Sequence, residues 1–496
     1  MKKLFLLLSS TFLLILLPAA KVFSQQRKTP YFESATCPDC PFPKAKATYL
    51  KEKRLSFGYL FVKENRKKKD SRIIRLSVGI IRHAEGEQSD HPIIVVHGGP
   101  GGAALEDVSA EMSLISQDRD IILIDQRGCG VSEPAPATNA GMKLTWMISK
   151  DLTPGQELAE HQSIASECRK ELIAAGLDLS AYNTAEIAAD INDLGTALGY
   201  TSWDIWGVSF GTRITLRVMQ DYPTRIRKAV LDSPLPPDAR YLEENPANFS
   251  RALNLLFQKC EADSACQLAY PNLAATYSAV IDSLTTHPFV VEMGDTARYQ
   301  DGRFVLNAQD FELAVHHALY ARAQYPFLPI VINAVRQRNT TVVKAFLQSM
   351  KNSLLELHYG IYYAVLCNDC IPANRLKAFD TVAAASMKKL PFYRADFLVC
   401  EKWGRVKRKP ARPSLPRDVP TLILSGELDP LVPPSYARLA GNKLRNSHYC
   451  LFENEGHWVT GSIEGARIVQ RFLQDEQLPA SKEETVNVYK LKFQTK

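Results

Sequence analysis

A glycine–x–serine–x–glycine motif occupies residues 207–211, between a strand-like run and a helix-like run. Residues 203–206 before it favour a β-strand, and residues 212–222 after it favour a helix. A serine hydroxyl is a poor nucleophile unless a sharp turn places it beside a base, and small residues two before and two after Ser209 permit such a turn. An ordinary glycine-rich turn is the alternative. The motif therefore predicts a nucleophile elbow if the chain also supplies a base and an acid.

The first 24 residues have the pattern of an export signal. Lys2 and Lys3 precede an apolar run over residues 4–20, and small residues follow up to Ser24. This pattern is typical of a secretory signal peptide, and we predict cleavage after Ser24. A retained anchor is the alternative, but Pro18 and the short apolar core argue against a helix that needs about 20 apolar residues to span a membrane. We expect export to the periplasm or the medium, without stable membrane association of the mature chain.

The charge balance gives no reason to expect a nucleic-acid partner. The formal net charge is +7, and removal of the signal with its three lysines leaves +4, which is small for a chain of 496 residues. Hydrophobic residues make up 46% of the chain, enough for a large globular core. We expect either one large domain with an insertion or two domains.

Short apolar runs alternate with helix-like segments through the first half of the chain. The runs at 92–96, 120–125, 203–206 and 228–232 have the length and composition of buried strands. A helix-like segment at 155–175 is one of those that separate them. This alternation predicts a mostly parallel sheet with helices on both faces.

The first of these apolar runs leads straight into residues 97–102, four of which are glycines. Glycines in such a loop let backbone N–H groups point into a cavity, which is how serine hydrolases build one half of an oxyanion hole. We predict Gly99 as this donor, with Gly98 as the alternative, and the N–H of Phe210 as the second donor. A phosphate-binding loop is the competing interpretation, and it fails because no Gly-Lys-Ser/Thr sequence follows.

A carboxylate and a histidine follow in the last quarter of the chain. Asp429 comes just after the strand-like run at 421–425, where catalytic groups collect in open parallel sheets, and Glu427 is its rival. His457 lies in a turn after a further short strand. The chain order of serine, carboxylate and histidine is that of α/β-hydrolases. We therefore predict an α/β-hydrolase fold with Ser209, Asp429 and His457 as its catalytic triad.

The strand–helix alternation stops after residue 232. Prolines at 234–237 precede a long helix-like stretch, and a second proline-rich segment at 409–420 leads back into a strand. We interpret the intervening stretch as a large helical cap inserted into the hydrolase domain. The predicted division is a signal peptide at 1–24, the hydrolase domain at 25–235 and 416–496, and the cap at 236–415.

All ten cysteines lie in the mature part of the chain, and an even number in an exported protein predicts disulfides. Cys260 and Cys266 are the expected local pair, and the other pairings stay open. The Cys-x-x-Cys sequences at 37–40 and 367–370 have zinc-knuckle spacing, but they are far apart in the sequence and an oxidising compartment favours disulfides. We expect no metal site.

Together these motifs resemble the prolyl iminopeptidase and tripeptidyl aminopeptidase branch of the α/β-hydrolases. The segments that carry the resemblance are residues 97–102, 125–128, 207–211, 426–429 and 456–457. The long cap and the stretches at 260–271 and 400–403 resemble the exported tripeptidyl aminopeptidase group more than the small cytosolic iminopeptidases. Cys129 stands where the family usually has threonine, and either pairs with Cys168 or stays a free thiol. Cys370 is also a departure from the family pattern.

The resemblance implies an exported serine exopeptidase that hydrolyses peptide bonds near free N-termini through an acyl-enzyme, with no cofactor. An esterase or another acyl hydrolase on the same fold is the nearest alternative, because fold and triad do not fix the substrate. A non-catalytic binding protein that keeps the fold is the alternative from another class. The presence of all three triad residues argues against that last possibility.

An aminopeptidase also needs carboxylates that hold the α-ammonium group of its peptide substrate. The family resemblance places such carboxylates on or near the cap. The candidates are Asp369, Glu401, Glu243 and Glu244. Asp369 is preferred because it follows Cys367 in a stretch that resembles the family sequence.

Overall fold

The computed structural model describes most of the chain. The described residues are 28–36, 54–83, 90–107, 111–136, 138–349, 357–371, 375–386, 391–403, 418–474, 482–487 and 489–495. The predicted signal peptide and the Cys37–Cys40 sequence lie outside them. Among the described helices, none combines the length and the apolar character needed to cross a membrane.

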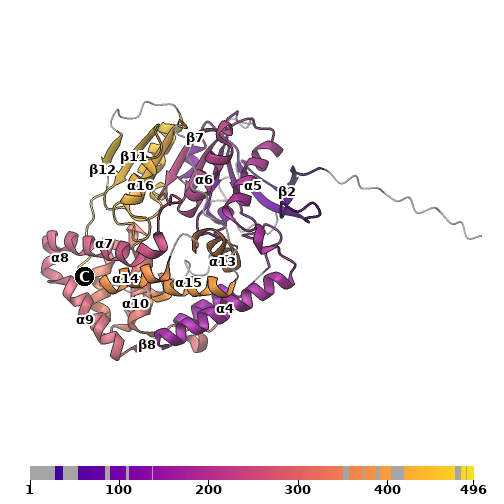
Figure 1. Cartoon of the computed structure of the whole chain (residues 1–496). Helices are drawn as coiled ribbons and strands as arrows, with labels where there is room; N and C mark the ends of the chain where they lie inside the picture. Colours follow the sequence, from indigo (N-terminus) through magenta and orange to yellow (C-terminus); the bar gives the residue numbers. More distant parts are fainter. Residues whose placement is uncertain are drawn as a thin grey trace, which may run out of the picture.

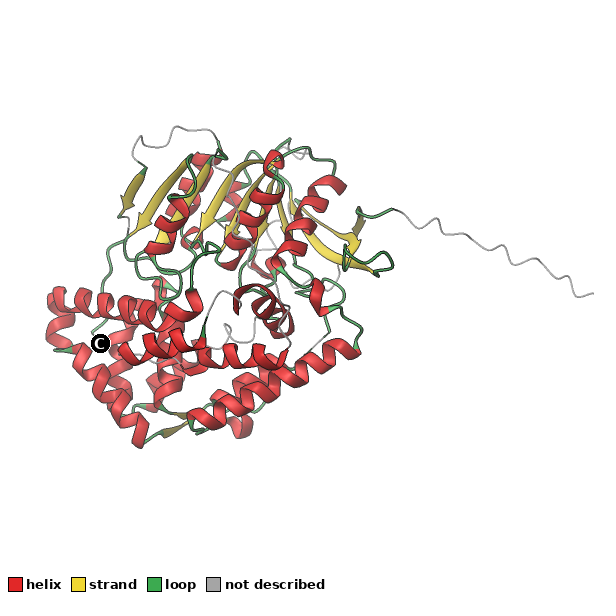
Figure 2. Ribbon diagram, in the orientation of Figure 1, coloured by secondary structure: helices red, strands yellow, loops and turns green. Residues whose placement is uncertain are grey.

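A ten-stranded sheet forms one half of the molecule, with strand order β1-β2-β3-β5-β4-β6-β7-β10-β11-β12 (Figure 1, Figure 2). The strands are β1 (Tyr31–Ala35), β2 (Leu55–Lys63), β3 (Ile73–Ile81), β4 (Ile93–Val96), β5 (Ile121–Ile124), β6 (Trp203–Val208), β7 (Ile226–Asp232), β10 (Thr421–Gly426), β11 (Ser447–Phe452) and β12 (Glu483–Val486). The pairings β1·β2, β2·β3 and β3·β5 are antiparallel, and the pairings from β5 to β12 are parallel. The predicted mostly parallel sheet is confirmed.

Helices cover both faces of the sheet. One face carries α5 (Thr184–Ala197), α6 (Phe210–Asp221) and α16 (Pro434–Gly441), and the other carries α2 (Met112–Ile115) and α17 (Ile463–Leu473). Successive side chains of a strand point to opposite faces, so β4 contributes Ile94 and Val96 to the first core and Ile93 and Val95 to the second. All four residues are buried, which explains why this strand is a continuous apolar run.

Strand pairing brings the carboxyl ends of the central strands to one edge of the sheet. Val96 of β4 pairs with Gly207 of β6, and Val208 of β6 pairs with Asp232 of β7. Leu424 of β10 pairs with the same Asp232. The glycine loop, the elbow and the turns after β10 and β11 therefore gather at this edge, where open parallel sheets bind ligands.

The segment between β7 and β10 forms a mostly helical layer beside this edge (Figure 2). Its elements are α7 (Tyr241–Ala262), α8 (Ser264–Ala269), α9 (Leu273–Thr286), β8 (Phe289–Glu292), β9 (Arg303–Leu306), α10 (Ala308–Ala318), α11 (Leu328–Arg336), α12 (Thr340–Ser349), α13 (Tyr359–Val365), α14 (Leu376–Ala385) and α15 (Pro391–Trp403). We call this layer the cap; the domain boundaries at 236–415 stay a prediction. The antiparallel hairpin of β8 and β9 is not predicted from the sequence, which indicates only helices in this segment. Each strand has four residues, too few for a period of two to be distinctive.

Helix α4 (Pro154–Ala174) precedes the elbow in the chain, yet it lies beside α15 of the cap (Figure 1). It follows α3 (Ala140–Ile148), and a capping box between Thr153 and Gln156 fixes its start. Arg169 of α4 donates a hydrogen bond to the carbonyl of Trp403 in α15 at 2.7 Å. The cap therefore packs against a helix from the N-terminal half of the chain.

Two disulfides link elements of the cap. Cys260–Cys266, the pair expected from the sequence, joins α7 to α8. Cys367–Cys400 joins the π-helical turn at Leu366–Cys370 to α15. The described cysteines outside these two disulfides are Cys129, Cys168, Cys370 and Cys450, all buried. Cys129 and Cys168 therefore do not pair with each other.

Candidate active site

Ser209 lies at the tight turn between β6 and α6. Its backbone has φ 56° and ψ −126°, a conformation that is strained for a residue with a side chain. The Ser209 N–H donates to the carbonyl of Asp232 at 2.9 Å and holds the turn against β7. A Cβ at Gly211 would lie 2.0 Å from the carbonyl oxygen of Val96, and one at Gly207 would lie 2.7 Å from that of Gly211. Both glycines are needed for this turn to close.

Asp429 and His457 form a hydrogen-bonded pair at the same edge. Oδ2 of Asp429 lies 2.6 Å from Nδ1 of His457. Oδ1 accepts hydrogen bonds from the N–H groups of Leu431 at 2.9 Å and Val432 at 2.8 Å, so the carboxylate is fixed within its own turn. With Nδ1 bound to the carboxylate, the other imidazole nitrogen is left for chemistry. His457 and Ser209 both line one cavity.

Glu427, the rival acid, contacts other partners. Its Oε2 accepts a hydrogen bond from the N–H of Asn454 at 3.0 Å and lies 3.0 Å from Nζ of Lys259. Arg251 of α7 donates to the backbone carbonyl of Glu427 at 2.7 Å and to that of Asp429 at 2.6 Å. A cap helix therefore holds the turn that carries the carboxylate partner of His457.

The loop around His457 is held from both layers. The His457 N–H donates to the carbonyl of Tyr320 in the cap at 2.9 Å, and the two rings pack with centroids 5.0 Å apart. On the sheet side, the carboxylate of Asp232 accepts hydrogen bonds from the N–H groups of Val459 and Thr460. Burial lowers the pKa of His457, but the charge and hydrogen bond of Asp429 outweigh it, so the pKa lies above its ordinary value.

The glycine loop at 97–102 passes directly over the elbow. A Cβ at Gly98 would lie 2.8 Å from Cβ of Ser209, so a side chain there would collide with the nucleophile turn. Gly99 has φ +111°, a region that favours glycine. Gln126 donates to the carbonyl of His97 at 2.8 Å and ties the loop to the turn after β5. Gly98 and Gly99 line the cavity together with Ser209.

Phe210 begins α6, directly after the serine. The N–H groups of a first helical turn have no carbonyl partner within the helix, so they are free to bind an anion. Phe210 follows Ser209 directly in the chain, and Gly98 of the glycine loop lies against Ser209. This arrangement suits the oxygen of a tetrahedral intermediate.

The cavity above Ser209 has a volume of about 460 Å³ and falls within the range of about 300–1,000 Å³ typical of small-ligand sites. The cap side of its wall is rich in tyrosine side chains, namely Tyr241, Tyr320, Tyr359, Tyr362 and Tyr393. The sheet side contributes the glycine loop, Ser209 and His457. The cavity therefore lies between a tyrosine-rich wall of the cap and Ser209.

Asp396 of α15 is a buried carboxylate in the wall of this cavity, and it is not among the residues predicted from the sequence. It is 1% exposed and accepts a hydrogen bond from the hydroxyl of Tyr362 at 2.7 Å. Burial raises its pKa to about 7, against the opposing effect of the Tyr362 hydrogen bond. The missed signal is its spacing: Asp396 lies four residues after Phe392 and four before Cys400, within the apolar stripe of a helix.

The four carboxylates predicted to bind a substrate amine lie outside the residues that line the cavity. Asp369 instead accepts hydrogen bonds from the N–H and the hydroxyl of Thr184, both at 2.6 Å, at the start of α5. Glu243 accepts from the N–H of Arg375, Glu244 accepts from the hydroxyl of Tyr436, and Glu401 is exposed on α15. The first three act as acceptors in the packing of the fold, and a role of these four residues in amine binding stays a prediction.

Comparisons with known families cover both halves of the site. The alpha/beta hydrolase fold family matches residues 91–278, which include the glycine loop and Ser209. The family of TAP-like proteins matches residues 391–485, which include Asp396, Asp429 and His457. The two matches leave most of the cap between them.

Curated relatives are peptidases at low identity. A "Probable proline iminopeptidase" from Streptomyces coelicolor is 25% identical over 238 residues, which span 44% of this chain and 61% of that protein. The serine protease Hip1 of Mycobacterium tuberculosis is 24% identical over 401 residues, or 74% of this chain and 75% of that protein. A proline iminopeptidase of Xylella fastidiosa is 26% identical over 149 residues, or 29% of this chain and 33% of that protein.

Proposed function

Because the chain is an α/β-hydrolase of the prolyl iminopeptidase and tripeptidyl aminopeptidase group, we propose that it is an exported serine exopeptidase that hydrolyses peptide bonds near free N-termini. The observation that carries this proposal is the buried carboxylate of Asp396, in the tyrosine-lined cavity that also contains Ser209 and His457. An aminopeptidase needs a carboxylate near its nucleophile to bind the α-ammonium group of the substrate. A hydrolase of neutral esters has no need for one.

The proposed chemistry is acyl transfer through Ser209. Its Oγ attacks the carbonyl carbon of the scissile bond while Nε2 of His457 accepts the proton and later gives it to the leaving amine. Asp429 orients the imidazole and stabilises its charged form, which the 2.6 Å hydrogen bond to Nδ1 supports. Backbone N–H groups of Gly99 and Phe210 bind the oxyanion, and a water activated by the same imidazole then releases the acyl group.

We assign the substrate α-ammonium group to Asp396. A free carboxyl in this position has a pKa of about 7, and a bound ammonium ion would favour its charged form and so lower that pKa. The rings of Tyr359, Tyr362 and Tyr393 line the same cavity and can interact with a cation through their faces. Asp396 thereby replaces Asp369 as the proposed amine-binding residue.

The limited cavity supports an exopeptidase over an endopeptidase. A chamber of about 460 Å³ beneath the cap has room for the end of a peptide. The separation between the proposed amine-binding carboxylate and Ser209 would then set how many residues are released. Free peptides are the proposed substrates.

Export is supported by two observations. The signal pattern at residues 1–24 predicts secretion. The disulfides Cys260–Cys266 and Cys367–Cys400 are stable in oxidising compartments and rare in the cytosol.

A panel of fluorogenic amides tests the activity. We expect turnover of prolyl, alanyl, dipeptidyl or tripeptidyl amides, with mass spectrometry of natural peptides identifying the released fragment. N-acetylated amides of the same sequence should react poorly, because they lack the ammonium group. Equal kcat/KM for free and acetylated amides, or turnover of esters alone, would contradict an aminopeptidase.

A fluorophosphonate probe tests whether the chain is an enzyme at all. Labelling of the wild type that is lost in Ser209→Ala supports the assigned nucleophile. An unlabelled wild type would indicate a hydrolase-fold binding protein.

A further inference from the structure

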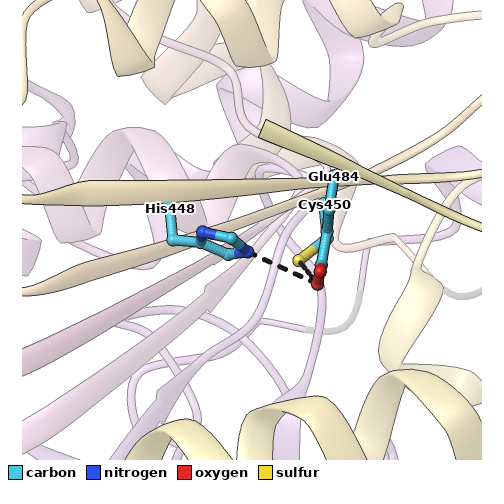
Figure 3. Close-up of side chains that lie close together, drawn as sticks. All are labelled: His448, Cys450 and Glu484. Atoms are coloured by element: carbon cyan, nitrogen blue, oxygen red, sulfur yellow. Dashed lines mark hydrogen bonds and ion pairs between the residues drawn. The ribbon is translucent and has the colours of Figure 1, made fainter. Parts of the chain in front are cut away.

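Three potential metal ligands meet where β11 pairs with β12 (Figure 3). His448 and Cys450 are two residues apart on β11 and so point to the same face, and Glu484 of β12 is the direct pairing partner of Cys450. Sγ of Cys450 lies 3.0 Å from Oε1 of Glu484, and Nε2 of His448 lies 3.3 Å from the same oxygen. All three ligand atoms lie within 4.8 Å of one another. None of these residues lines the cavity above Ser209.

Nε2 of His448, the imidazole nitrogen in this cluster, has no hydrogen-bond partner among the described residues. His448 is 6% exposed, and its Nε2 is buried without a hydrogen bond to any described residue. The carboxylate oxygen at 3.3 Å is close enough for an ion pair, but the geometry is not that of a hydrogen bond. A buried ring nitrogen left in this way is costly unless a further group binds it.

We infer that His448, Cys450 and Glu484 form a binding site for one zinc ion. With Zn–N and Zn–O bonds of about 2.0–2.2 Å and a Zn–S bond of about 2.3 Å, tetrahedral angles separate nitrogen from oxygen by about 3.4 Å and sulfur from oxygen by about 3.6 Å. The first of these separations matches the 3.3 Å between His448 and Glu484. The second requires the Cys450–Glu484 contact to open by about 0.6 Å, within the reach of side-chain rotation.

The ligand set selects the class of metal. A thiolate, an imidazole and a carboxylate suit Zn²⁺, whereas Mg²⁺ and Ca²⁺ prefer oxygen ligands alone. The side chain of Glu484 is 28% exposed, so an ion has a path from solvent and a water molecule can take the fourth position. On binding, the Cys450 thiol gives up its proton to solvent and Sγ coordinates as the thiolate.

The zinc ion would join the edge strand to the body of the sheet. β12 has four residues and pairs with β11, whose chain continues into the loop that carries His457. A ligand from each strand makes the ion a crosslink across this pairing. The inference goes beyond the proposed hydrolysis and does not depend on it.

Metal analysis of the untagged, mature-length protein tests the site. After chelator treatment and reloading, we expect one zinc per chain by elemental analysis, and a thiolate-to-metal absorption band when Co²⁺ replaces zinc. Glu484→Gln and Cys450→Ser should each weaken zinc binding by about 100-fold or more. Zinc should also raise the Tm of the wild type by several degrees and leave the Tm of both variants unchanged.

The matched control is the double variant Cys168→Ser/His287→Gln, which removes a buried thiol and an exposed imidazole elsewhere. It should bind zinc like the wild type. If Cys450→Ser does not fold, Glu484→Gln alone tests the zinc site, because the side chain of Glu484 is partly exposed and its replacement should disturb the fold less. Absence of stoichiometric zinc in the wild type, or unchanged zinc affinity in Glu484→Gln, would overturn the inference.

Discussion

Oδ2 of Asp429 lies 2.6 Å from Nδ1 of His457, and the carboxylate is completely buried while 10% of the imidazole is exposed. A charged acceptor in this position stabilises the protonated imidazole, because their attraction is little screened by water. This pair makes His457 a stronger base than a free histidine. The effect of this pair can be measured through the pH dependence of the rate at which Ser209 is labelled by a fluorophosphonate.

The rate of fluorophosphonate labelling should fall as the pH is lowered through the pKa of His457. In the proposed mechanism the neutral imidazole accepts the proton of Ser209, so protonation of His457 removes the base. Because the pKa is raised, the midpoint should lie above the value of about 6.5 of an ordinary histidine. Labelling involves no substrate amine, so titration of Asp396 should not contribute to this profile.

Asp429→Asn should move that midpoint to lower pH and reduce kcat by about 10³- to 10⁴-fold. The amide cannot stabilise the imidazolium and no longer enforces the productive tautomer. Glu427→Gln is the matched control, and its profile should keep the wild-type midpoint. A wild-type midpoint in Asp429→Asn would count against the assigned role of the acid.

Ser209→Ala and Ser209→Gly should both lose more than about 10⁴-fold in kcat, since each removes the nucleophile. They should differ in stability. With φ at 56° and ψ at −126°, alanine retains the backbone strain that glycine relieves, so the glycine variant should be the more stable of the two by about 1 kcal/mol. Urea unfolding of both proteins measures the difference, and a less stable glycine variant would show that the turn is not strained.

Asp396→Asn should raise KM for amides with a free N-terminus by about 10- to 100-fold, because it removes a charge-assisted hydrogen bond. The rate of fluorophosphonate labelling should stay near the wild-type value. Asp369→Asn serves as the control, since Asp369 binds Thr184 at the start of α5 and should leave KM unchanged. A larger KM increase in Asp369→Asn than in Asp396→Asn would reverse the assignment.

The double variant Cys367→Ala/Cys400→Ala should lower the free energy of unfolding by about 3–4 kcal/mol, as expected for a disulfide with a sequence separation of 33. Cys260→Ala/Cys266→Ala, with a separation of 6, should lose about 2 kcal/mol. The first disulfide anchors α15, so its loss should also raise KM through Asp396. Equal effects of the two variants on KM would show that α15 is held by packing alone.

Much of the fold could be predicted because buried parallel strands are continuous apolar runs. The apolar run at 92–96 and the glycines around Ser209 are required by the local geometry of a buried strand and of a tight turn. Such local requirements can be recognised in the sequence. Asp429 and His457 follow their strands by a few residues, and parallel pairing then brings them together. Chain order and strand ends were therefore sufficient to predict that they meet.

The walls of the cavity could not be predicted in the same way. Whether Asp369 or Asp396 faces the cavity depends on how α13 and α15 pack, which no local pattern determines. Asp369 is close to a cysteine in sequence but accepts hydrogen bonds at the start of a distant helix. The position of α4 beside α15 likewise depends on contacts such as that between Arg169 and Trp403.

The insertion of the cap between β7 and β10 has a consequence for biosynthesis. Leu231 of β7 pairs with Ile423 of β10, so the edge of β7 stays open while the ribosome makes every residue between them. The acid and the histidine emerge later still. A nascent chain that has already folded the turn at Ser209 lacks His457 until the ribosome has passed that residue, so the site stays incomplete until then. Pairing across so long a separation is slow, so the central sheet is completed late in folding.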